Sequence, residues 1–134
     1  MIGQTYTELY FFEKDPAMIR DLAAAFDEMI ARPYPGREDW WWCDSLFMAP
    51  PALARLHRAT GEEKYLVLMD TLFADMTAFL YDPEEKLYYR DKNYFGARAS
   101  NGEKVFWSRG NGWVVAGLAR MLDYLPADHP TRSR

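Results

Sequence analysis

The sequence predicts an all-α domain with a small β-hairpin inserted late in the chain, and three observations support that prediction. Apolar residues recur at spacings of three and four through most of the chain. Two turn-to-helix junctions, 14–19 and 61–66, lie about 46 residues apart, as they do in stacked α-hairpins. Only the stretch 81–109 loses the helical period. With 134 residues, 49% of them apolar, the chain has the size and composition of a single domain.

Helices are expected first in the N-terminal quarter of the chain. The stretch from Ile2 to Phe12 is short and amphipathic. Asp15 is suited to cap a second helix, and Pro16 is favoured in its first turn. Apolar residues then keep the helical spacing until the loop 32–36, which is rich in proline.

The middle of the chain predicts two more helices. One begins at Asp44 or at the proline pair 50–51, and it ends near Gly61, a usual capping residue. The next begins after the acidic pair 62–63, which suits the positive end of a helix dipole, and continues to Leu80.

A β-hairpin and a last helix complete the expected fold. Two strands, 86–90 and 104–108, flank the turn signal Asn101-Gly102. An apolar stripe from Trp113 to Leu125 predicts the last helix, and the polar tail after it is expected to be frayed.

Charge and composition exclude several classes of function. The formal net charge is −4 and no cluster of Lys and Arg stands out, which argues against nucleic acid or a membrane surface as partner. No apolar run reaches the roughly 20 residues of a membrane span, and no signal peptide follows Met1. Cys43 is the single cysteine, and His57 and His129 are far apart, so we expect no disulfide, metal or cofactor.

Aromatic residues make up 16% of the chain, and several stand among polar side chains. Such surfaces suit sugars, which offer apolar faces and hydroxyl edges. In the run Trp40-Trp41-Trp42-Cys43-Asp44, at least one indole is expected to face a groove. Asp44 then has two interpretations. It is either the N-cap of a helix beside a core tryptophan pair, or a general acid whose pKa the indoles raise by desolvation.

A second motif, Ser108-Arg109-Gly110-Asn111-Gly112-Trp113, lies at a strand-to-helix junction. One interpretation is a glycine turn with Asn111 as cap. The other is a sugar site in which the glycines admit a ligand to backbone N–H groups, Arg109 binds a carboxylate and Trp113 stacks on a ring. A nucleotide phosphate loop is not supported, because the glycine spacing is too short. The run Tyr88-Tyr89-Arg90-Asp91 fits an ordinary hairpin, and His57 suits the last turn of its helix.

Two runs of residues resemble a known enzyme family. Cys43-Asp44-Ser45-Leu46-Phe47-Met48-Ala49-Pro50-Pro51 and Phe106-Trp107-Ser108-Arg109-Gly110-Asn111-Gly112-Trp113 are similar to segments of glycoside hydrolase family 105, the unsaturated rhamnogalacturonyl hydrolases. Family 88, the unsaturated glucuronyl hydrolases, is a more distant match. The segments 2–6 and 59–61 fit the same pattern, so the resemblance covers nearly the whole chain. It implies an (α/α)6 toroid of stacked α-hairpins.

The resemblance also implies a substrate and a mechanism. The substrate is an oligosaccharide with a 4,5-unsaturated uronyl group, made by a polysaccharide lyase from a polymer such as pectin. Asp44 matches the general acid that protonates C4 of the double bond before water adds at C5. Trp42 matches an aromatic wall of the site. Arg109 and Trp113 match substrate-binding positions, with Arg109 near the uronate carboxylate.

The chain departs from the family in length and at one position. Twelve helices need roughly 300 residues or more. We therefore expect residues 1–134 to form a single partial (α/α)-barrel catalytic domain, with the family's N-terminal part and its second acidic residue upstream of Met1. Little activity of the chain alone and self-association through exposed helix faces are then expected. Some relatives have a histidine where this chain has Arg90. The implied compartment is the bacterial cytoplasm, with the periplasm also open.

Other functions stay open on sequence alone. A non-catalytic sugar-binding module would use the tryptophans and Arg109. A helical-repeat scaffold would bind a protein partner and have no use for Asp44. An ordinary glycosidase would need a second carboxylate near Asp44. The candidates by residue type are Asp39, Asp70, Asp75 and Asp91.

Overall fold

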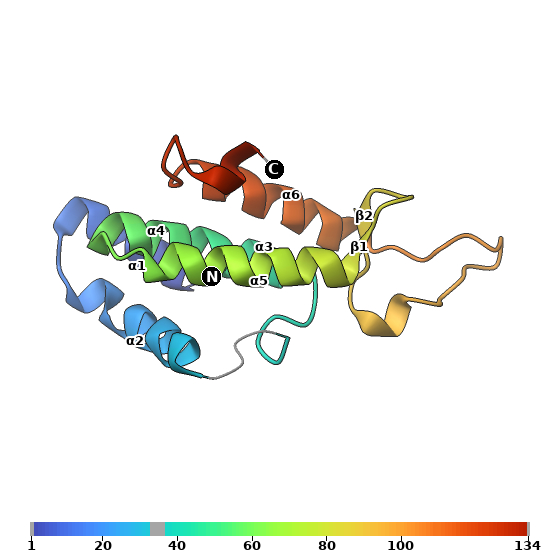
Figure 1. Cartoon of the computed structure of the whole chain (residues 1–134), viewed down its shortest axis with the longest axis horizontal. Coiled ribbons are helices and arrows are strands. Elements are labelled where there is room, and N and C mark those ends of the chain that lie inside the picture. The colour runs from blue at the N-terminus through green and yellow to red at the C-terminus, as the bar shows by residue number, and fades with distance from the viewer. Residues whose placement is uncertain (1, 33–36, 134) are drawn as a thin grey trace.

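The computed structural model describes residues 2–32 and 37–133, and helices account for most of them (Figure 1). The helices are α1 (Ile2–Glu13), α2 (Ala17–Ala31), α3 (Ser45–Met48), α4 (Pro50–Thr60), α5 (Lys64–Leu80) and α6 (Ser108–Leu122). The two strands form a hairpin and are β1 (Tyr81–Asp82) and β2 (Leu87–Tyr88). There are also two short 3₁₀ turns in the described residues, η1 (Lys92–Tyr94) and η2 (Pro130–Ser133). The expected all-α class with a small hairpin is confirmed. Most of the expected loop 32–36 lies outside the described residues.

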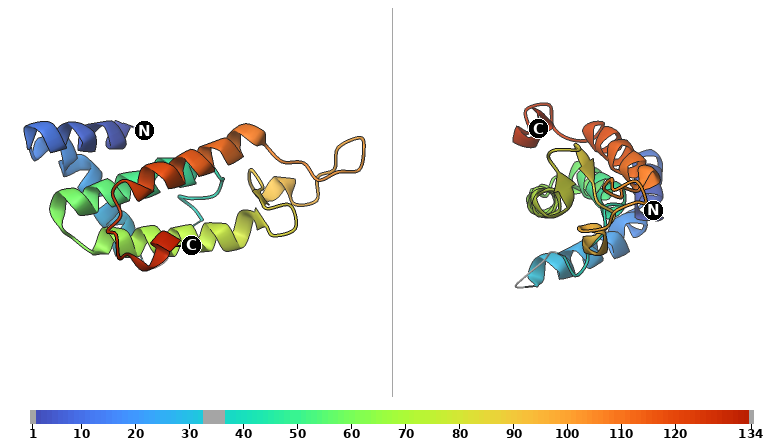
Figure 2. Two further views of the ribbon diagram at one scale, coloured as in Figure 1. Left: turned by 90° about the horizontal axis from the view of Figure 1, so that it is seen from above. Right: turned by 90° about the vertical axis from the view of Figure 1, so that its right-hand side faces the viewer.

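The helices are arranged as stacked hairpins. α4 and α5 run antiparallel at the centre, and α6 lies along α3 and α4 (Figure 2). α1 packs on α4, and α2 contacts α1 and α5. Side chains between these helices are almost fully buried and form the core; they include Leu53, Leu56, Leu66, Met69, Leu72 and Met76.

A helix break separates α3 from α4, so both start points proposed for this helix are used. Pro50 and Pro51 have no N–H to donate to the preceding turn. Gln4 of α1 fills the break, because its side-chain amide donates to the carbonyl oxygens of Phe47 (2.8 Å) and Met48 (3.1 Å). Gln4 is itself only 3% exposed. A buried amide therefore satisfies backbone carbonyls that a continuous helix would have bonded.

The hairpin differs from the predicted one. β1 and β2 pair antiparallel, with Tyr81 opposite Tyr88. The prediction that 86–90 would pair with 104–108 is wrong, because Lys104 makes only an isolated bridge to Arg98. The turn signal Asn101-Gly102 does mark a turn, and the φ of Gly102 is +87°. Closing the short loop 83–86 costs less chain entropy than closing the loop 91–103 of the predicted pairing, and this difference favours the observed hairpin.

The last helix begins five residues earlier than predicted and ends earlier too. α6 starts at Ser108 rather than Trp113, so the glycine motif is helical and not a turn. The expected frayed tail is also wrong up to Thr131. The Thr131 hydroxyl lies 3.0 Å from the carboxylate of Asp70 on α5 and 2.6 Å from the ring of His129. These contacts hold the tail on α5.

The hairpin, η1 and a projecting loop gather at one end of the helices, beside the first turn of α6 (Figure 1). Lys104 anchors the loop through an ion pair of 2.8 Å with Asp82. This ammonium holds the pKa of Asp82 well below its usual range, with help from backbone N–H bonds. The carboxylate therefore stays charged, and the anchor stays in place, at all ordinary pH values.

A partly buried ion cluster joins α1, α4 and α6. Glu8 accepts hydrogen bonds from Arg55 (2.8 Å) and Arg120 (3.0 Å), and the Arg55 side chain is only 3% exposed. Glu8→Ala should lower the free energy of unfolding by about 2 kcal/mol, because it leaves the Arg55 charge buried without its anion. Asp21→Ala, which breaks the exposed Arg20–Asp21 pair, should change it by less than about 1 kcal/mol. Equal midpoints in urea denaturation for the two variants would contradict this assignment.

No helix in the described part of the chain combines the length and the apolarity that a membrane span requires.

Candidate active site

Asp44 stands immediately before α3 with a carboxylate that makes no capping hydrogen bond. The N-cap interpretation of its side chain is therefore wrong. Its Oδ1 lies 3.6 Å from the thiol Sγ of Cys43. The carboxylate lines an open pocket of about 170 Å³ together with Phe47, Met48 and Trp113. An acidic group thus faces a surface made mostly of apolar and aromatic side chains.

The aromatic part of this pocket comes from two elements. The rings of Phe47 on α3 and Trp113 on α6 lie 4.8 Å apart, and Trp113 is 37% exposed. An indole held on one side and open on the other suits the apolar face of a sugar ring. Trp113 therefore lies beside Asp44 in this pocket, and its role in binding substrate stays a prediction.

The three adjacent tryptophans have different environments. Trp40 is 2% exposed and belongs to the core, whereas Trp41 is 46% exposed. That an indole of this run faces a groove stays a prediction. Trp42 is half-buried, and its ring lies 4.5 Å from that of Trp41. Trp42 is not among the residues that line the Asp44 pocket, so its role as an aromatic wall stays a prediction.

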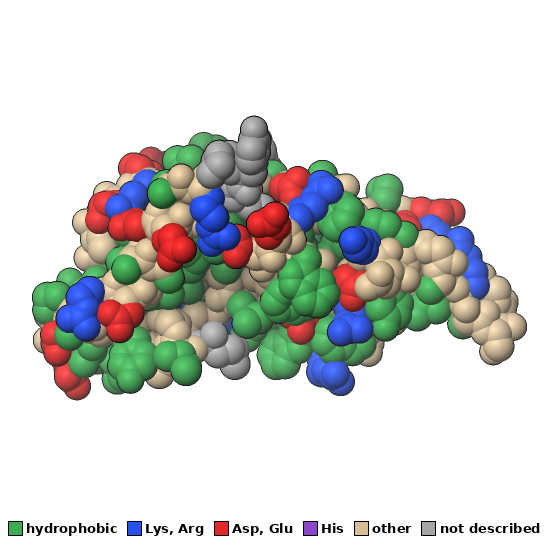
Figure 3. All heavy atoms as spheres, turned by 90° about the horizontal axis from the view of Figure 1, so that it is seen from below, with side chains coloured by type: hydrophobic (Ala, Val, Ile, Leu, Met, Phe, Trp, Pro, Cys, Tyr) green, Lys and Arg blue, Asp and Glu red, His purple; other side chains and the backbone are tan. Residues whose placement is uncertain are grey.

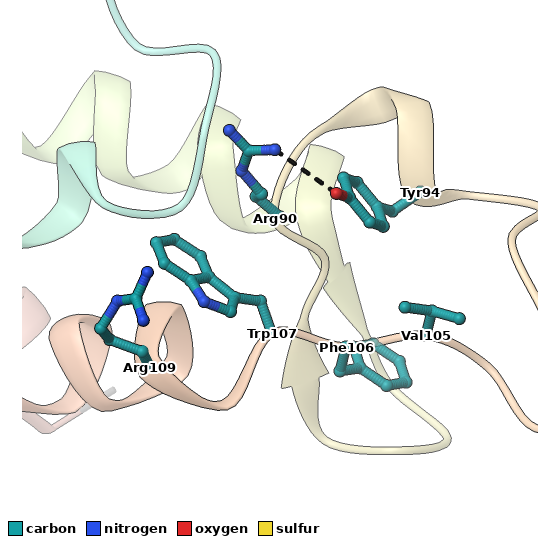
Figure 4. Close-up of a pocket in the computed structure, with 6 residues that line it drawn as sticks. All are labelled: Arg90, Tyr94, Val105, Phe106, Trp107 and Arg109. Carbon is teal, nitrogen blue, oxygen red and sulfur yellow. Dashed lines mark hydrogen bonds between the residues drawn. The ribbon is translucent and has the colours of Figure 1, made fainter. Parts of the chain in front are cut away.

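A second, larger pocket of about 450 Å³ is lined by two arginine side chains, Arg90 and Arg109 (Figure 4). The guanidinium of Arg109, in the first turn of α6, lies 4.6 Å from the ring centroid of Trp107. The guanidinium of Arg90, which follows β2, lies 5.8 Å from the same centroid. Arg90 also donates a long hydrogen bond of 3.4 Å to the Tyr94 hydroxyl. Val105 and Phe106 complete the lining.

The two pockets are neighbours. Arg109 and Trp113 are four residues apart on α6 and so lie on one face of the helix. Arg90 is tied to the Asp44 segment, because its backbone carbonyl accepts from the N–H of Cys43 at 2.9 Å. The structure therefore brings three of the four predicted site residues, Asp44, Arg109 and Trp113, to one end of the helices.

Sequence reasoning missed Arg90, Tyr94 and Trp107 as pocket residues. An exposed hairpin pair with Asp91 was the simpler interpretation of Arg90. In the structure Asp91 is 2% exposed and caps η1 by accepting from the N–H of Asn93 at 2.9 Å. The signal that could have found Arg90 is its position beside two tyrosines, but only the fold shows that this position meets Trp107.

The glycine motif packs helices rather than admitting a ligand. A Cβ atom on Gly110 would lie 2.8 Å from the Cys43 Sγ and 2.5 Å from the Trp107 ring. Asn111 neither caps a turn nor faces either pocket. Its amide accepts from the N–H of Tyr88 at 2.8 Å and donates to the carbonyl of Tyr88 at 2.9 Å. The motif thus fixes the start of α6 against Cys43 and β2.

All four candidate second carboxylates are bound to other groups. Asp39 pairs with Arg32 at 2.8 Å, and Asp75 makes two hydrogen bonds to Arg37. Asp70 holds the tail, and Asp91 caps η1. Within the residues described, an ordinary two-carboxylate glycosidase therefore gains no support. The same residues contain no group of three or more metal-ligating side chains.

Burial and the neighbouring Asp44 raise the pKa of the Cys43 thiol to about 12. Roughly a thousandfold less thiolate should then be present at pH 8 than in an ordinary cysteine, and thiolate is the reactive form. Iodoacetamide should leave native Cys43 unmodified under conditions that alkylate the chain in guanidinium chloride, as read by intact mass. Alkylation at similar rates in both states would contradict the buried position.

An acid, an exposed indole and two guanidinium groups at one end of a helical-hairpin fold are side-chain types that carbohydrate-active proteins use. The model of glycosyl hydrolase family 88 matches residues 1–134, and the chain belongs to this family. A solved family 88 structure from Bacteroides vulgatus superposes with a TM-score of 0.91 at 32% identity, over 98% of this chain and 38% of its own. The expected fold, part of an (α/α)6 toroid, is thereby confirmed.

Other relatives agree with this membership. This chain is 43% identical to an unsaturated 3S-rhamnoglycuronyl hydrolase of Alteromonas sp. (strain LOR), over 71% of its residues. It is also 43% identical to an unsaturated 3S-rhamnoglycuronyl hydrolase of Formosa agariphila, over 70% of its residues. The chain spans only about a quarter of their lengths, 23% and 26%. A structure named as a polysaccharide lyase matches with a TM-score of 0.92 at 36% identity, over 98% of this chain and 37% of its own. A family 105 structure from C. acetobutylicum, at 23% identity and a TM-score of 0.70, has the same fold; the match covers 97% of this chain and 40% of that structure.

Proposed function

We propose that this chain takes part in the hydrolysis of oligosaccharides that end in a 4,5-unsaturated uronyl group. One observation carries the proposal: Asp44 presents a carboxylate free of capping bonds to an aromatic pocket beside two arginines. Relatives named as unsaturated 3S-rhamnoglycuronyl hydrolases support the substrate class. The proposal concerns the whole protein's activity, to which this chain contributes part of the site.

The proposed mechanism is hydration of the double bond. Asp44 in its protonated form donates its proton to C4, and positive charge develops at C5 and the ring oxygen. Water then adds at C5 and gives a proton to the Asp44 carboxylate, which leaves a neutral hemiketal and restores the acid. The resulting hemiketal opens and releases the saturated sugar and a keto acid. Trp113 stacks on the uronyl ring, Trp42 forms an aromatic wall, and Arg109 binds the carboxylate through its planar fork.

The proposed domain arrangement explains why the site has a single free acid in the described residues. We propose that residues 1–134 form one part of a toroidal catalytic domain and that the second acid comes from another part of that domain. The coverage of 37% and 38% of two solved relatives supports this arrangement. The chain alone should then turn over substrate far more slowly than a form extended at its N-terminus.

The test follows the ultraviolet absorbance of the conjugated double bond in lyase-generated unsaturated disaccharides. We expect the absorbance to fall with the extended form and to change little with the 134-residue chain. Binding of the disaccharide with no loss of absorbance in either form would favour a non-catalytic sugar-binding module. Absence of binding as well would favour a helical-repeat scaffold.

A second candidate function is β-elimination, favoured by the 36%-identical structure named as a polysaccharide lyase. In that reaction Arg90 and Arg109 neutralise a saturated uronate carboxylate, which acidifies the C5 hydrogen. The Tyr94 oxygen, which lies 3.4 Å from Arg90 and must be deprotonated for this step, takes that proton while the C4–O bond breaks and C4=C5 forms. The leaving oxygen then takes the proton from Tyr94. The same absorbance assay separates the two functions, because a lyase acting on intact polymer makes the signal rise.

We also propose that the chain self-associates. Several large apolar side chains on its helices are more than 60% exposed, and hydrophobic atoms reach the surface over the face shown in Figure 3. They are Ile2, Phe12, Val67 and Val115. Covering such groups stabilises association by the hydrophobic effect. Light scattering during gel filtration should give a mass above 15.7 kDa that rises with concentration, and Phe12→Ser should lower it. A constant monomer mass would contradict the proposal.

A further inference from the structure

We infer that the two oxygens of the Asp44 carboxyl group have different tasks, and that Cys43 is the positioning residue that assigns them. The Cys43 thiol holds Oδ1 as a hydrogen-bond acceptor, and Oδ2 carries the proton that the acid gives to the substrate. The inference rests on the proposed function, in which Asp44 is the general acid, and it adds the residue that orients that acid.

The first argument is the contact between the two side chains. The Cys43 Sγ lies 3.6 Å from the Asp44 Oδ1, a distance at which a thiol donates a hydrogen bond to oxygen. Within the described part of the chain, the Asp44 carboxylate accepts no other hydrogen bond. Oδ2 is therefore the oxygen left to meet a substrate in the pocket that Asp44 lines.

The second argument is that the fold holds the thiol in place. Cys43 is fully buried, and its backbone N–H donates to the Arg90 carbonyl at 2.9 Å. Its sulfur packs on the first turn of α6, where a Cβ atom on Gly110 would lie 2.8 Å from the Sγ. The Asp44 side chain is only half-buried and has no capping bond. A fixed donor beside an otherwise unrestrained carboxyl group limits its rotation, which is how a catalytic group is positioned.

The third argument is the protonation state of the thiol. Burial and the charge of Asp44 raise the pKa of Cys43 to about 12, and the charge of Arg90 offsets only part of that rise. The thiol therefore keeps its proton throughout the neutral range and stays a donor. Because sulfur is a weak acceptor, an acid proton on Oδ1 would face a poor partner. The proton of the neutral acid consequently sits on Oδ2.

This assignment gives each oxygen of Asp44 one part in the reaction. The Oδ2–H bond breaks while the electron pair of the double bond forms the new C4–H bond. Water then adds at C5 and returns a proton to the carboxylate, and Oδ1 keeps its bond to the thiol throughout. Without the thiol, either oxygen can take the proton and the carboxyl group can rotate. A smaller share of the bound substrate then meets the acid in the reactive orientation.

The first measurement is the infrared S–H stretch of the 134-residue chain, which has a single cysteine and therefore a single such band. A hydrogen bond to a carboxylate lowers the frequency of this band. Asp44→Ala should raise the frequency, because the acceptor is lost. Asp75→Ala is the matched control, since Asp75 pairs with Arg37 rather than with the thiol, and it should leave the band in place. This measurement changes nothing at Cys43, so it tests the contact even if a Cys43 variant fails to fold.

The second measurement is the rate at which an N-terminally extended form consumes the double bond. Cys43→Ala should lower kcat about tenfold, the size of one net hydrogen bond, and should leave KM within about twofold of the wild type. Cys43→Ser keeps a donor at this position and should restore most of kcat. Ile19→Val is the control for a purely structural loss, because it trims a buried side chain on α2, away from the pocket lining, and kcat should not change. Circular dichroism checks the fold of each variant.

Three results would each overturn the inference: an S–H band that Asp44→Ala leaves in place, a kcat of Cys43→Ala within about twofold of the wild type, or a Cys43→Ser variant no faster than Cys43→Ala. The proposed function fails separately. If the extended wild type and Cys43→Ala consume the double bond equally fast, hydrolysis stands and the positioning role is wrong. If the extended wild type consumes nothing, hydrolysis is wrong and the role of Cys43 in it falls too, even where the band shows the hydrogen bond.

Discussion

Asp44→Asn should reduce consumption of the double bond by about 10²- to 10⁴-fold in an N-terminally extended form, the usual contribution of a positioned general acid. The amide has nearly the shape of the carboxyl group, but it has no proton of suitable acidity to give to C4. Asp44 makes no capping bond, and within the described part of the chain its carboxylate accepts a hydrogen bond from the Cys43 thiol alone, so the substitution should leave the fold intact. Initial rates at saturating substrate measure the effect.

Binding and stability supply the controls for this result. The dissociation constant of the unsaturated disaccharide and the denaturation midpoint should change little in Asp44→Asn. Asp75→Asn removes a carboxylate that pairs with Arg37, and it should retain the full rate. Asp44→Asn with a rate within tenfold of the wild type would show that another group protonates the double bond.

Gly117→Ala should destabilise the protein and disturb the site from a distance. α6 crosses α3 so closely here that a Cβ atom would lie 2.4 Å from the Leu46 carbonyl oxygen and 2.7 Å from the Phe47 Cα. These are backbone atoms, so relief requires a shift of α6 against α3. We expect a loss of about 1–3 kcal/mol in the free energy of unfolding, as for other overpacked sites. Because Asp44 precedes α3 and Trp113 lies on α6, ligand binding should weaken as well.

Gly112→Ala is the matched control on the same helix. A Cβ atom at this position has no neighbour within 4 Å. Alanine favours a helix over glycine, so this variant should be more stable by about 0.5–1 kcal/mol. The two substitutions are chemically identical, and urea denaturation should move their midpoints in opposite directions. Movement in the same direction would contradict the close contact at Gly117.

The local parts of the fold could be predicted because short-range rules decide them. Asp15 accepts from the N–H of Ala17 at 2.9 Å, and Gly61 ends α4 at a φ of 76°. The stripes of α2, α4 and α5 face the core as their spacing predicts. Strand pairing was not predictable in the same way. β2 could pair with either of two segments, 81–82 or 104–108. The shorter connecting loop and the hydrogen bonds of Asn111 to Tyr88 favour pairing with 81–82.

The site was predictable only in part for a similar reason. Asp44, Arg109 and Trp113 stand in motifs whose residue types already indicate acid chemistry on a sugar. Arg90 and Trp107 stand in runs that have ordinary structural explanations. They form a pocket because the Arg90 carbonyl bonds the Cys43 N–H, which joins segments that are 47 residues apart in the chain.

The sequence by itself determined the all-α class, the caps at Asp15 and Gly61, and the presence of an acid in an aromatic motif. These depend on side chains within one or two turns of each other, so the residue types are sufficient to read them. The tertiary structure alone decided that Asp44 is free rather than capping, that the glycines serve helix packing, and that two arginines share one indole. Those properties depend on contacts between segments that are far apart in the sequence. Such contacts form only in the folded chain, where side-chain shape and burial decide which segments pack together.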